Sequence, residues 1–467
     1  MPNNLSRGKQ EIRVRFAPSP TGLFTIGNAR TALFNYLFAK QSKGQFILRI
    51  EDTDKERSKE EYEKDIIENL KWLGLNWDEG PVRQSERTGL YKEQIKKLLE
   101  QGDAFYCDHA KEELEKEKKE QSQKKEAPRH ICDSFGSLAP KREGIIRFRA
   151  PKGKIVFNDL VRGKVEIEGG LLGDFSIAKD EKTPLYNLSA VVDDAEMKIS
   201  HIIRGEDHLP NTPKQILLYQ ALGFNIPQFA HLPLILGPDK SKMSKRHGSV
   251  SVGEYRKQGY LTEALINFMA LLGWNPGTEK EIFSLDELVK EFSLERVHKG
   301  GAIFNLEKLN WINSQYIKKM DLDKLTKRCL EYLPKDTDFE YAKKVVALEQ
   351  ERLKKLSEIG EMTQFFFEDE LDYDKNLLIW KEMSLKQVKE NLELLVKELE
   401  KTGEFDQKTL ERQLMPLTEK HGRGELLWPL RVALTGQKAS PGPFEVMEVL
   451  GKEKSLGRIK QAINLIK

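Results

Sequence analysis

The pattern of hydrophobic positions changes along the chain, from short alternating runs in the first half to long helical repeats in the second. Ile12 to Phe16 alternates like a β-strand, and the proline- and glycine-rich turn after it excludes regular structure until a helix can begin near Ile26. A second apolar run, residues 45–50, is typical of a strand. Two strands joined by a helix are expected to be parallel neighbours with a right-handed crossover. The opening stretch therefore predicts an α/β sheet.

Later runs extend this prediction along the first half of the chain. Helices are expected over residues 59–73, with a capping box that starts at Ser58, and over residues 91–99 and 213–222. Further strands are predicted in two groups. Antiparallel strands of an α+β insertion, residues 84–185, are expected at residues 145–150, 154–157 and 164–167, and returning strands of the main sheet at residues 186–194, 199–204 and 231–236.

From about residue 261 the repeats become almost wholly helical. The second half is therefore expected to be all-helical, with no period strict enough to indicate a solenoid. Helices are predicted over residues 261–272, 285–291, 306–317, 339–366, 385–399, 409–421, 426–434 and 444–450. The expected domains are residues 1–83 with 186–240, 84–185, 241–320, 321–375 and 376–467.

Composition narrows the class of protein. A chain of 467 residues is too long for one hydrophobic core and corresponds to about three to five domains. Its 77 Lys and Arg nearly balance 74 Asp and Glu, so any nucleic-acid contact must use local basic patches. The polar run at residues 111–125 favours a solvated helix or arm over an RNA contact. Three cysteines, no secretory signal and no long apolar run predict a cytoplasmic protein without a membrane partner.

Three stretches carry candidate chemistry of their own. The free N–H groups at the start of the helix near Ile26 form a candidate anion site, and Gly27 would let a ligand approach. Glu51 ends a predicted strand at the edge where open α/β sheets bind ligands. A cationic loop follows at residues 242–246. For the first stretch, the alternative is a strand, turn and helix that bind no ligand. For Glu51, it is an acidic residue that caps the next helix, and for the cationic loop it is an ordinary surface charge cluster.

Two pairs of metal-binding residue types flank the polar run. Cys107 and His109 precede it, and His130 and Cys132 follow about twenty residues later. Thiolate and imidazole ligands at this separation can close a tetrahedral Zn²⁺ site between two arms of a hairpin. Unliganded surface side chains are the alternative interpretation.

The amino-acid sequences of these stretches resemble motifs of a known family. FAPSPTG at residues 16–22, LRIEDTD at residues 48–54 and KMSKR at residues 242–246 resemble signature motifs of class I aminoacyl-tRNA synthetases, specifically those of bacterial glutamyl-tRNA synthetases. The resemblance extends to the C-terminus. It implies a Rossmann-like parallel-sheet catalytic domain with an insertion that binds the acceptor stem. An all-helical stem-contact domain, which carries the KMSKR loop, and a helical anticodon-binding domain in two parts would follow.

The same resemblance implies an activity. A monomeric enzyme would use ATP with Mg²⁺ to convert L-glutamate into glutamyl-adenylate and would then transfer glutamate to the 3′ end of tRNA(Glu), releasing AMP and pyrophosphate. Glutamine-specific relatives have proline-glutamate-proline-asparagine where this chain has Pro18 to Thr21, which favours glutamate. The competing hypotheses are a glutamyl transferase that acts on a modified tRNA base and a weakly active or non-catalytic tRNA-binding paralogue.

By resemblance, two sets of residues would form the catalytic site. The catalytic and ATP-binding set is Thr25, Ile26, Gly27, Asn28, Asp207, Lys242, Lys245 and Arg246. The glutamate-binding set is Arg15, Ser19, Glu51, Tyr186 and Arg204. The arginines suit the two substrate carboxylates and Glu51 suits the ammonium group.

Three further residue-level expectations depend on the resemblance. Some bacterial relatives hold zinc in this insertion with a Cys-x-Cys pair, whereas here the order is Cys-x-His and His-x-Cys. Arg352 lies near a position that reads the last anticodon base in relatives, with an ordinary exposed helix residue as the alternative. Thr25 replaces the histidine that the first signature loop usually has. Threonine keeps a donor hydroxyl but is shorter, so a slow but active enzyme is expected.

Overall fold

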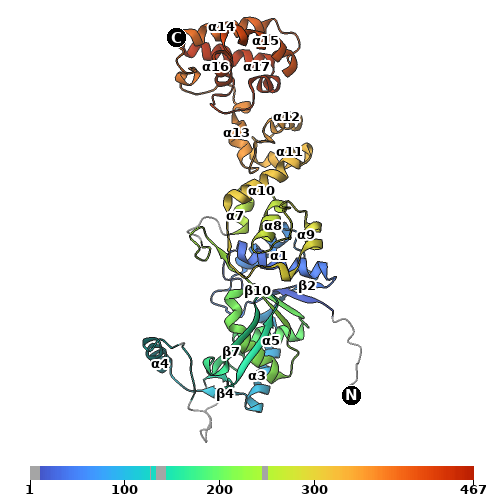
Figure 1. Ribbon diagram of the computed structural model, residues 1–467, viewed down its shortest axis with the longest axis vertical. Helices are drawn as coiled ribbons and strands as arrows, with labels where there is room; N and C mark the ends of the chain where they lie inside the picture. Colours follow the sequence, from blue (N-terminus) through green and yellow to red (C-terminus); the bar gives the residue numbers. More distant parts are fainter. Residues whose placement is uncertain (1–10, 127, 133–143, 245–250, 467) are drawn as a thin grey trace. The chain divides into compact units, whose positions relative to one another are not determined.

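The computed structural model describes residues 11–126, 128–132, 144–244 and 251–466 (Figure 1). These residues form two compact units. The first contains the chain up to Arg256 together with Thr262–Lys308, and the second contains Lys257–Leu261 together with the chain from Leu309 onward. Residues 245–250, which include Lys245 and Arg246 of the cationic loop, lie outside the described residues.

A seven-stranded sheet organises the first unit. Its strand order is β3-β2-β1-β10-β11-β6-β7, and all neighbours are parallel except the last pair, which is antiparallel. The strands are β1 (Arg13–Phe16), β2 (Gln45–Ile50), β3 (Glu79–Arg83), β6 (Lys154–Asp159), β7 (Gly163–Glu168), β10 (His201–Gly205) and β11 (Gln228–Leu232). The predicted parallel pairing of the first two strands is confirmed, with Val14 opposite Phe46.

Helices cover both faces of this sheet. Figure 1 shows α1 (Ile26–Gln41), α8 (Thr262–Leu271) and α9 (Leu285–Glu291) on one side, with α3 (Thr88–Gln101) and α5 (Tyr186–Glu196) on the other. Helix α6 (Thr212–Leu222) packs against α3 and α5. Helices α2 (Glu60–Trp72) and α7 (Val252–Lys257) and the short pair β12 (Ile235–Leu236) and β13 (Ala302–Ile303) complete the unit.

A second sheet lies within the predicted insertion. Strands β4 (Ala104–Cys107), β5 (Ile145–Phe148), β8 (Phe175–Asp180) and β9 (Thr183–Pro184) are antiparallel neighbours in that order. The polar run forms α4 (Lys111–Gln123), which has no buried side chain among its described residues. A helix with so little apolar surface cannot be held by hydrophobic packing.

Four predictions for the first unit were wrong. Residues 186–194, expected as a strand, lie in α5, because Leu188, Val191 and Val192 bury one helical face. The strands predicted near residues 154–167 form an antiparallel pair but join the main sheet, through Asp159 opposite Phe229. Alternation shows that a strand has two faces and does not say which sheet it joins.

The third error concerns the strand predicted over residues 231–236. Gln228–Leu232 forms β11 of the main sheet, whereas Ile235–Leu236 forms β12, which pairs with β13. The fourth error concerns a cap. Ser58 does not start a capping box, since α2 begins after Lys59 without a side-chain cap.

The second unit is helical, as predicted. Its helices are α10 (Leu306–Lys319), which begins at the end of the first unit, α11 (Leu322–Cys329), α12 (Phe339–Glu349), α13 (Glu358–Phe367), α14 (Leu385–Glu400), α15 (Gln407–His421), α16 (Arg423–Thr435) and α17 (Pro443–Leu465). The single helix predicted over residues 339–366 was wrong, because a turn after Glu349 divides it. Gln350 in this turn donates to the carbonyl groups of Ile317 and Met320. No described helix is both long and apolar enough to cross a membrane.

Candidate functional site

A cavity of about 700 Å³ opens at the carboxyl ends of β1 and β10, beside the start of α1. This is the edge at which open parallel sheets bind ligands. The structure gathers around it all the described residues that the sequence assigned to catalysis, ATP or glutamate. They are Arg15, Ser19, Thr25, Ile26, Gly27, Asn28, Glu51, Tyr186, Arg204, Asp207 and Lys242.

The first turn of α1 forms one wall of the cavity. Thr25 is the N-cap residue, and its hydroxyl oxygen accepts a hydrogen bond from the Asn28 N–H at 3.3 Å. A Cβ atom added at Gly27 would meet only the Thr25 side chain, at 3.8 Å. The protein therefore leaves space beside the first turn, where the helix dipole favours an anion.

A buried charge cluster supports the opposite wall. The Asp194 carboxylate accepts from Arg15 at 3.0 Å and from Arg49 at 2.7 Å, and Arg49 also donates to Glu51 at 2.9 Å. Burial alone would raise the pKa of Asp194, but the two guanidinium groups outweigh it and lower that pKa. Burial raises the pKa of Glu51 despite Arg49. A cationic ligand beside Glu51 would favour its charged form.

Arg204 differs from Arg15 in its partners. Only 5% of Arg204 is exposed, and it donates to Thr212 at 2.8 Å, His231 at 3.1 Å and the Tyr186 hydroxyl at 3.4 Å. Among the described residues no carboxylate forms an ion pair with it. Burial lowers the pKa of Arg204 because the charged form is poorly solvated. An anionic ligand in the cavity would supply the missing counter-charge.

The described part of the cationic loop reaches the same cavity. Lys242, Met243 and Ser244 line it, and the Lys242 ammonium group lies 3.5 Å from the Asp207 carboxylate. Both side chains are about half exposed, so this pair adds little to stability and leaves the lysine available to a ligand.

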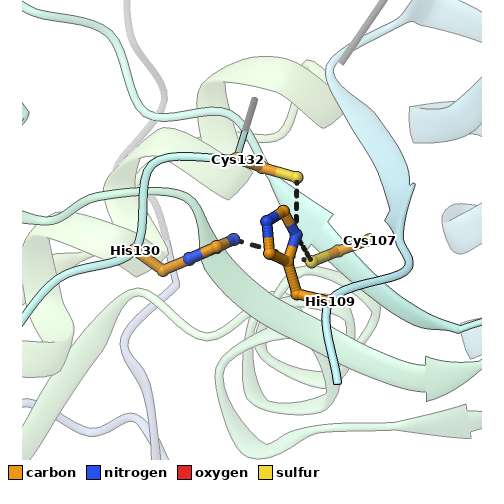
Figure 2. A group of neighbouring side chains, drawn as sticks. All are labelled: Cys107, His109, His130 and Cys132. Atoms are coloured by element: carbon orange, nitrogen blue, oxygen red, sulfur yellow. Dashed lines mark hydrogen bonds between the residues drawn. The ribbon is translucent and has the colours of Figure 1, made fainter. Parts of the chain in front are cut away.

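The four predicted metal ligands lie together in the insertion. Their donor atoms are all within 4.8 Å of one another, and Figure 2 shows both thiols and the His130 ring turned toward His109. Cys107 Sγ is 3.5 Å from His109 Nδ1 and 3.6 Å from His130 Nε2, and Cys132 Sγ is 3.7 Å from His109 Nδ1. Tetrahedral Zn²⁺ with ordinary bond lengths separates sulfur and nitrogen ligands by about 3.6 Å. The three sulfur–nitrogen distances therefore match a tetrahedral zinc site.

The His130 ring is oriented from its other side. Its Nδ1 lies 2.7 Å from a Glu117 carboxylate oxygen on α4, which leaves Nε2 to face the thiols. Carboxylate partners of this kind fix the tautomer of metal-binding histidines. The next turn of α4 is also held in place. The Gln121 side-chain amide donates to the Arg129 carbonyl group and accepts from the Arg129 N–H.

The second unit holds a separate cavity of about 550 Å³ near the start of α16. Its walls include Trp380 and Trp428, whose ring centroids are 5.0 Å apart, and the side chains of Arg423 and Arg431. Aromatic rings beside guanidinium groups are typical of surfaces that stack unpaired bases. This cavity was not predicted from the sequence, although the tryptophan and arginine pattern near residue 428 was a visible signal.

Arg352 lies in the turn between α12 and α13. One of its nitrogens donates to both carboxylate oxygens of Glu349, at 3.0 and 2.8 Å. The Glu349 side chain is fully buried, whereas 37% of the Arg352 side chain is exposed. Burial raises the pKa of Glu349 to about 7, against the opposing effect of Arg352.

Sequence reasoning missed the residues that support the catalytic cavity from behind. Arg49, Asp194 and His231 are almost completely buried and bond to residues of the cavity wall, and Asp159, also buried, bonds to His231. The adjacent acidic residues 193 and 194 within an apolar run were the one available signal, since buried carboxylates need partners.

Comparison with known proteins first defines the class. The model of the class I tRNA synthetase catalytic domain (E and Q) matches residues 11–311, and an anticodon binding domain matches residues 324–463. The parallel sheet, the cavity at its carboxyl edge and the helical second unit therefore define a class I aminoacyl-tRNA synthetase.

Comparison with individual relatives identifies the family within this class. Glutamate–tRNA ligase 2 of Thermoanaerobacter pseudethanolicus is 45% identical and covers 98% of this chain and 98% of its own. Glutamate–tRNA ligase 1 of Caldicellulosiruptor saccharolyticus is 47% identical, over 96% of this chain and 98% of its own. The crystal structure of a glutamate tRNA ligase from Elizabethkingia meningosepticum in complex with its amino acid superimposes with a TM-score of 0.88 at 34% identity, covering 98% of this chain and 100% of its own. The chain belongs to the glutamate–tRNA ligases.

Proposed function

We propose that this glutamate–tRNA ligase binds L-glutamate between Arg15, Arg204 and Glu51. The observation that carries the proposal is the buried Arg204 guanidinium, which has no anionic partner among the described residues although it lines the cavity. A substrate with two carboxylates and one ammonium group complements two arginines and one glutamate. Ser19 and Tyr186 add hydroxyl groups to the same wall.

ATP would lie along the opposite wall. The first turn of α1, with Ile26, Gly27 and Asn28, offers oriented N–H groups and open space, and Lys242 and Asp207 lie at the cavity rim. The sequence adds Lys245 and Arg246 for the phosphates. Synthetases of this class use Mg²⁺ with ATP, and the bound ion offsets charge on the phosphates.

Adenylate formation and transfer to tRNA require mainly that the reactants are positioned and that developing negative charge is stabilised. A substrate carboxylate oxygen attacks the α-phosphorus of ATP, the bond to the β-phosphate oxygen breaks, and pyrophosphate leaves with the developing negative charge. Lysine and arginine side chains and the α1 N–H groups would stabilise that charge. The terminal ribose hydroxyl of tRNA then attacks the glutamyl carbonyl carbon and releases AMP. Arg15 and Arg204 would hold glutamate in place for both steps.

Further parts of the chain would contact tRNA. We assign the acceptor stem to the insertion, residues 84–185, the stem to residues 241–320, and the anticodon to residues 321–375 and 376–467. The Trp380–Trp428 cavity supports the last assignment, because it offers stacking surfaces beside arginines. Arg352, held by Glu349, would discriminate between tRNA(Glu) and tRNA(Gln). The enzyme would act as a cytoplasmic monomer.

Zinc would be a structural ion of the insertion. Cys107, His109, His130 and Cys132 would hold it, and a closed four-ligand site stabilises a fold without taking part in catalysis.

Substitution of Arg204 by alanine tests the glutamate site. We expect the variant to lose glutamate use far more than ATP use, since an unpaired substrate carboxylate in a closed site costs about 2–5 kcal/mol. Pyrophosphate exchange with glutamate, with glutamine and with added tRNA measures both. Equal damage to the KM of glutamate and of ATP would remove Arg204 from the pocket. No exchange by the unchanged enzyme under any condition would favour a non-catalytic tRNA-binding protein.

A further inference from the structure

Three neighbouring strands of the main sheet contribute one chain of buried polar groups. Asp159 ends β6, His231 lies in β11 and Arg204 lies in β10. No more than 5% of any of these residues is exposed. Asp159 Oδ2 is 2.6 Å from His231 Nδ1, and His231 Nε2 is 3.1 Å from Arg204 Nε. Thr212 closes the group, with its hydroxyl 2.8 Å from Arg204 Nη2 and 3.0 Å from His231 Nε2.

The hydrogen bonds determine where the histidine proton lies. Arg204 Nε can only donate, so His231 Nε2 must accept and carry a lone pair. The ring proton is then on Nδ1, where Asp159 accepts it. Burial lowers the pKa of His231 more than Asp159 raises it, which agrees with a neutral ring. The other Asp159 oxygen accepts from the backbone N–H groups of Val161 and Arg162 and is therefore fixed.

This arrangement uses one side of the Arg204 guanidinium and leaves another. The Nε and Nη2 side faces His231 and Thr212. The remaining end, formed by Nη1 and the second N–H of Nη2, lies toward the Tyr186 hydroxyl, which also lines the cavity. A guanidinium end of this kind can donate two parallel hydrogen bonds to a carboxylate.

We propose that Asp159 and His231 are positioning residues that set the free end of Arg204 toward a carboxylate of the substrate glutamate. Neither residue lines the cavity, so both act through Arg204. The inference rests on the proposed glutamate site. It goes beyond that site by predicting that the tautomer of His231, which lies behind the site, determines the affinity for glutamate.

Asp159→Asn tests the role of the tautomer. The variant keeps the size of the side chain and an oxygen for the backbone N–H groups. Its amide would donate to His231 Nδ1, which moves the ring proton to Nε2 and places it against the Arg204 Nε–H; amide substitution at such a carboxylate preserves geometry but selects the wrong tautomer. We expect the KM for glutamate to rise at least about tenfold in tRNA-dependent pyrophosphate exchange, while the KM for ATP changes less than about twofold.

Two substitutions at His231 provide the matched pair. His231→Gln keeps an acceptor for Arg204 and a donor for Asp159, so it should retain most of the glutamate affinity. His231→Leu removes both and should resemble Asp159→Asn. A purely structural role predicts instead that glutamate and ATP are affected alike, or that the Gln and Leu variants are equally damaged, and either result would overturn the proposal. If the unchanged enzyme shows no glutamate-dependent exchange, the glutamate site itself is refuted rather than this inference.

Discussion

The Thr25 side chain has two roles in the structure. It caps α1 through its hydroxyl oxygen, and the same side chain lines the cavity beside Gly27. Histidine, which the family resemblance leads us to expect at this position, would reach farther into the cavity but is not a favoured N-cap. A substitution at this position should therefore move rate and stability in opposite directions.

We predict that Thr25→His raises the rate of adenylate formation at least several-fold, because a single transition-state donor is typically worth about 2.7–4 kcal/mol. Glutamate affinity should hardly change. The variant should also unfold more readily, since loss of an N-cap costs about 0.5–2 kcal/mol. The rate of pyrophosphate exchange at saturating substrates and the midpoint of thermal unfolding measure the two effects. Thr25→Ser, which keeps the cap, is the control, and an unchanged or lower rate in Thr25→His would show that other donors compensate.

Glu349 gives a second prediction at this scale. Burial raises its pKa to about 7, so the folded protein binds this proton more tightly than the unfolded chain does. The stability contributed by the protonated form is lost as the pH rises from about 4.5 to 7. Relative to the unchanged protein, Glu349→Gln should therefore be more stable at pH 8 than at pH 5. Thermal midpoints at both values check this, with the exposed Glu351→Gln as control. A difference that does not vary with pH would contradict the raised pKa.

Residue patterns predicted the cavity wall but not its support. Arg15, Glu51 and Arg204 were named from the resemblance to glutamyl-tRNA synthetases, and all three line the cavity. Asp159 and His231 lie on different strands, 72 residues apart, and their pairing depends on sheet order. A single sequence does not contain that information.

At the scale of elements, long periodic segments were predicted best. Helices α10, α14 and α15 agree with their predicted ranges to within about two residues. Helix α5 was mistaken for a strand because it is short and apolar. Its two buried aspartates are satisfied by side chains from elsewhere in the chain, which include Arg49, Arg87 and Tyr91. The turn after α12 was missed since apolar residues continue on both sides of it.

Helix α4 is expected to influence zinc binding in the insertion. Because α4 lacks an apolar face, its position depends on polar ties such as Glu117 to His130 and Gln121 to Arg129. We expect Glu117→Gln to weaken zinc binding about 10–100-fold, the usual effect of removing such a carboxylate. Competition with a chromogenic chelator measures the affinity. Glu115→Gln, an exposed change on the same helix, should have no effect, and equal affinities in all three proteins would refute the role of Glu117.

The whole molecule combines two kinds of unit in one enzyme. The first unit carries the sheet and cavity of a class I synthetase, and the second carries a helical fold that matches an anticodon binding domain. The order of units could be predicted because the hydrophobic period changes near the boundary. The exact division could not, since residues 262–308 pack with the sheet unit although they are helical in sequence pattern.

Charging of tRNA(Glu) is the most direct test that this chain is a glutamate–tRNA ligase. Purified tRNA(Glu) is incubated with the full chain, ATP, Mg²⁺ and radiolabelled glutamate, and the aminoacylated 3′ end is measured against parallel reactions with glutamine or without ATP. We predict ATP-dependent attachment of glutamate to tRNA(Glu), at a modest rate because of Thr25, and no attachment of glutamine. Attachment of glutamine, or no attachment of glutamate by folded protein at any enzyme concentration, would contradict this prediction.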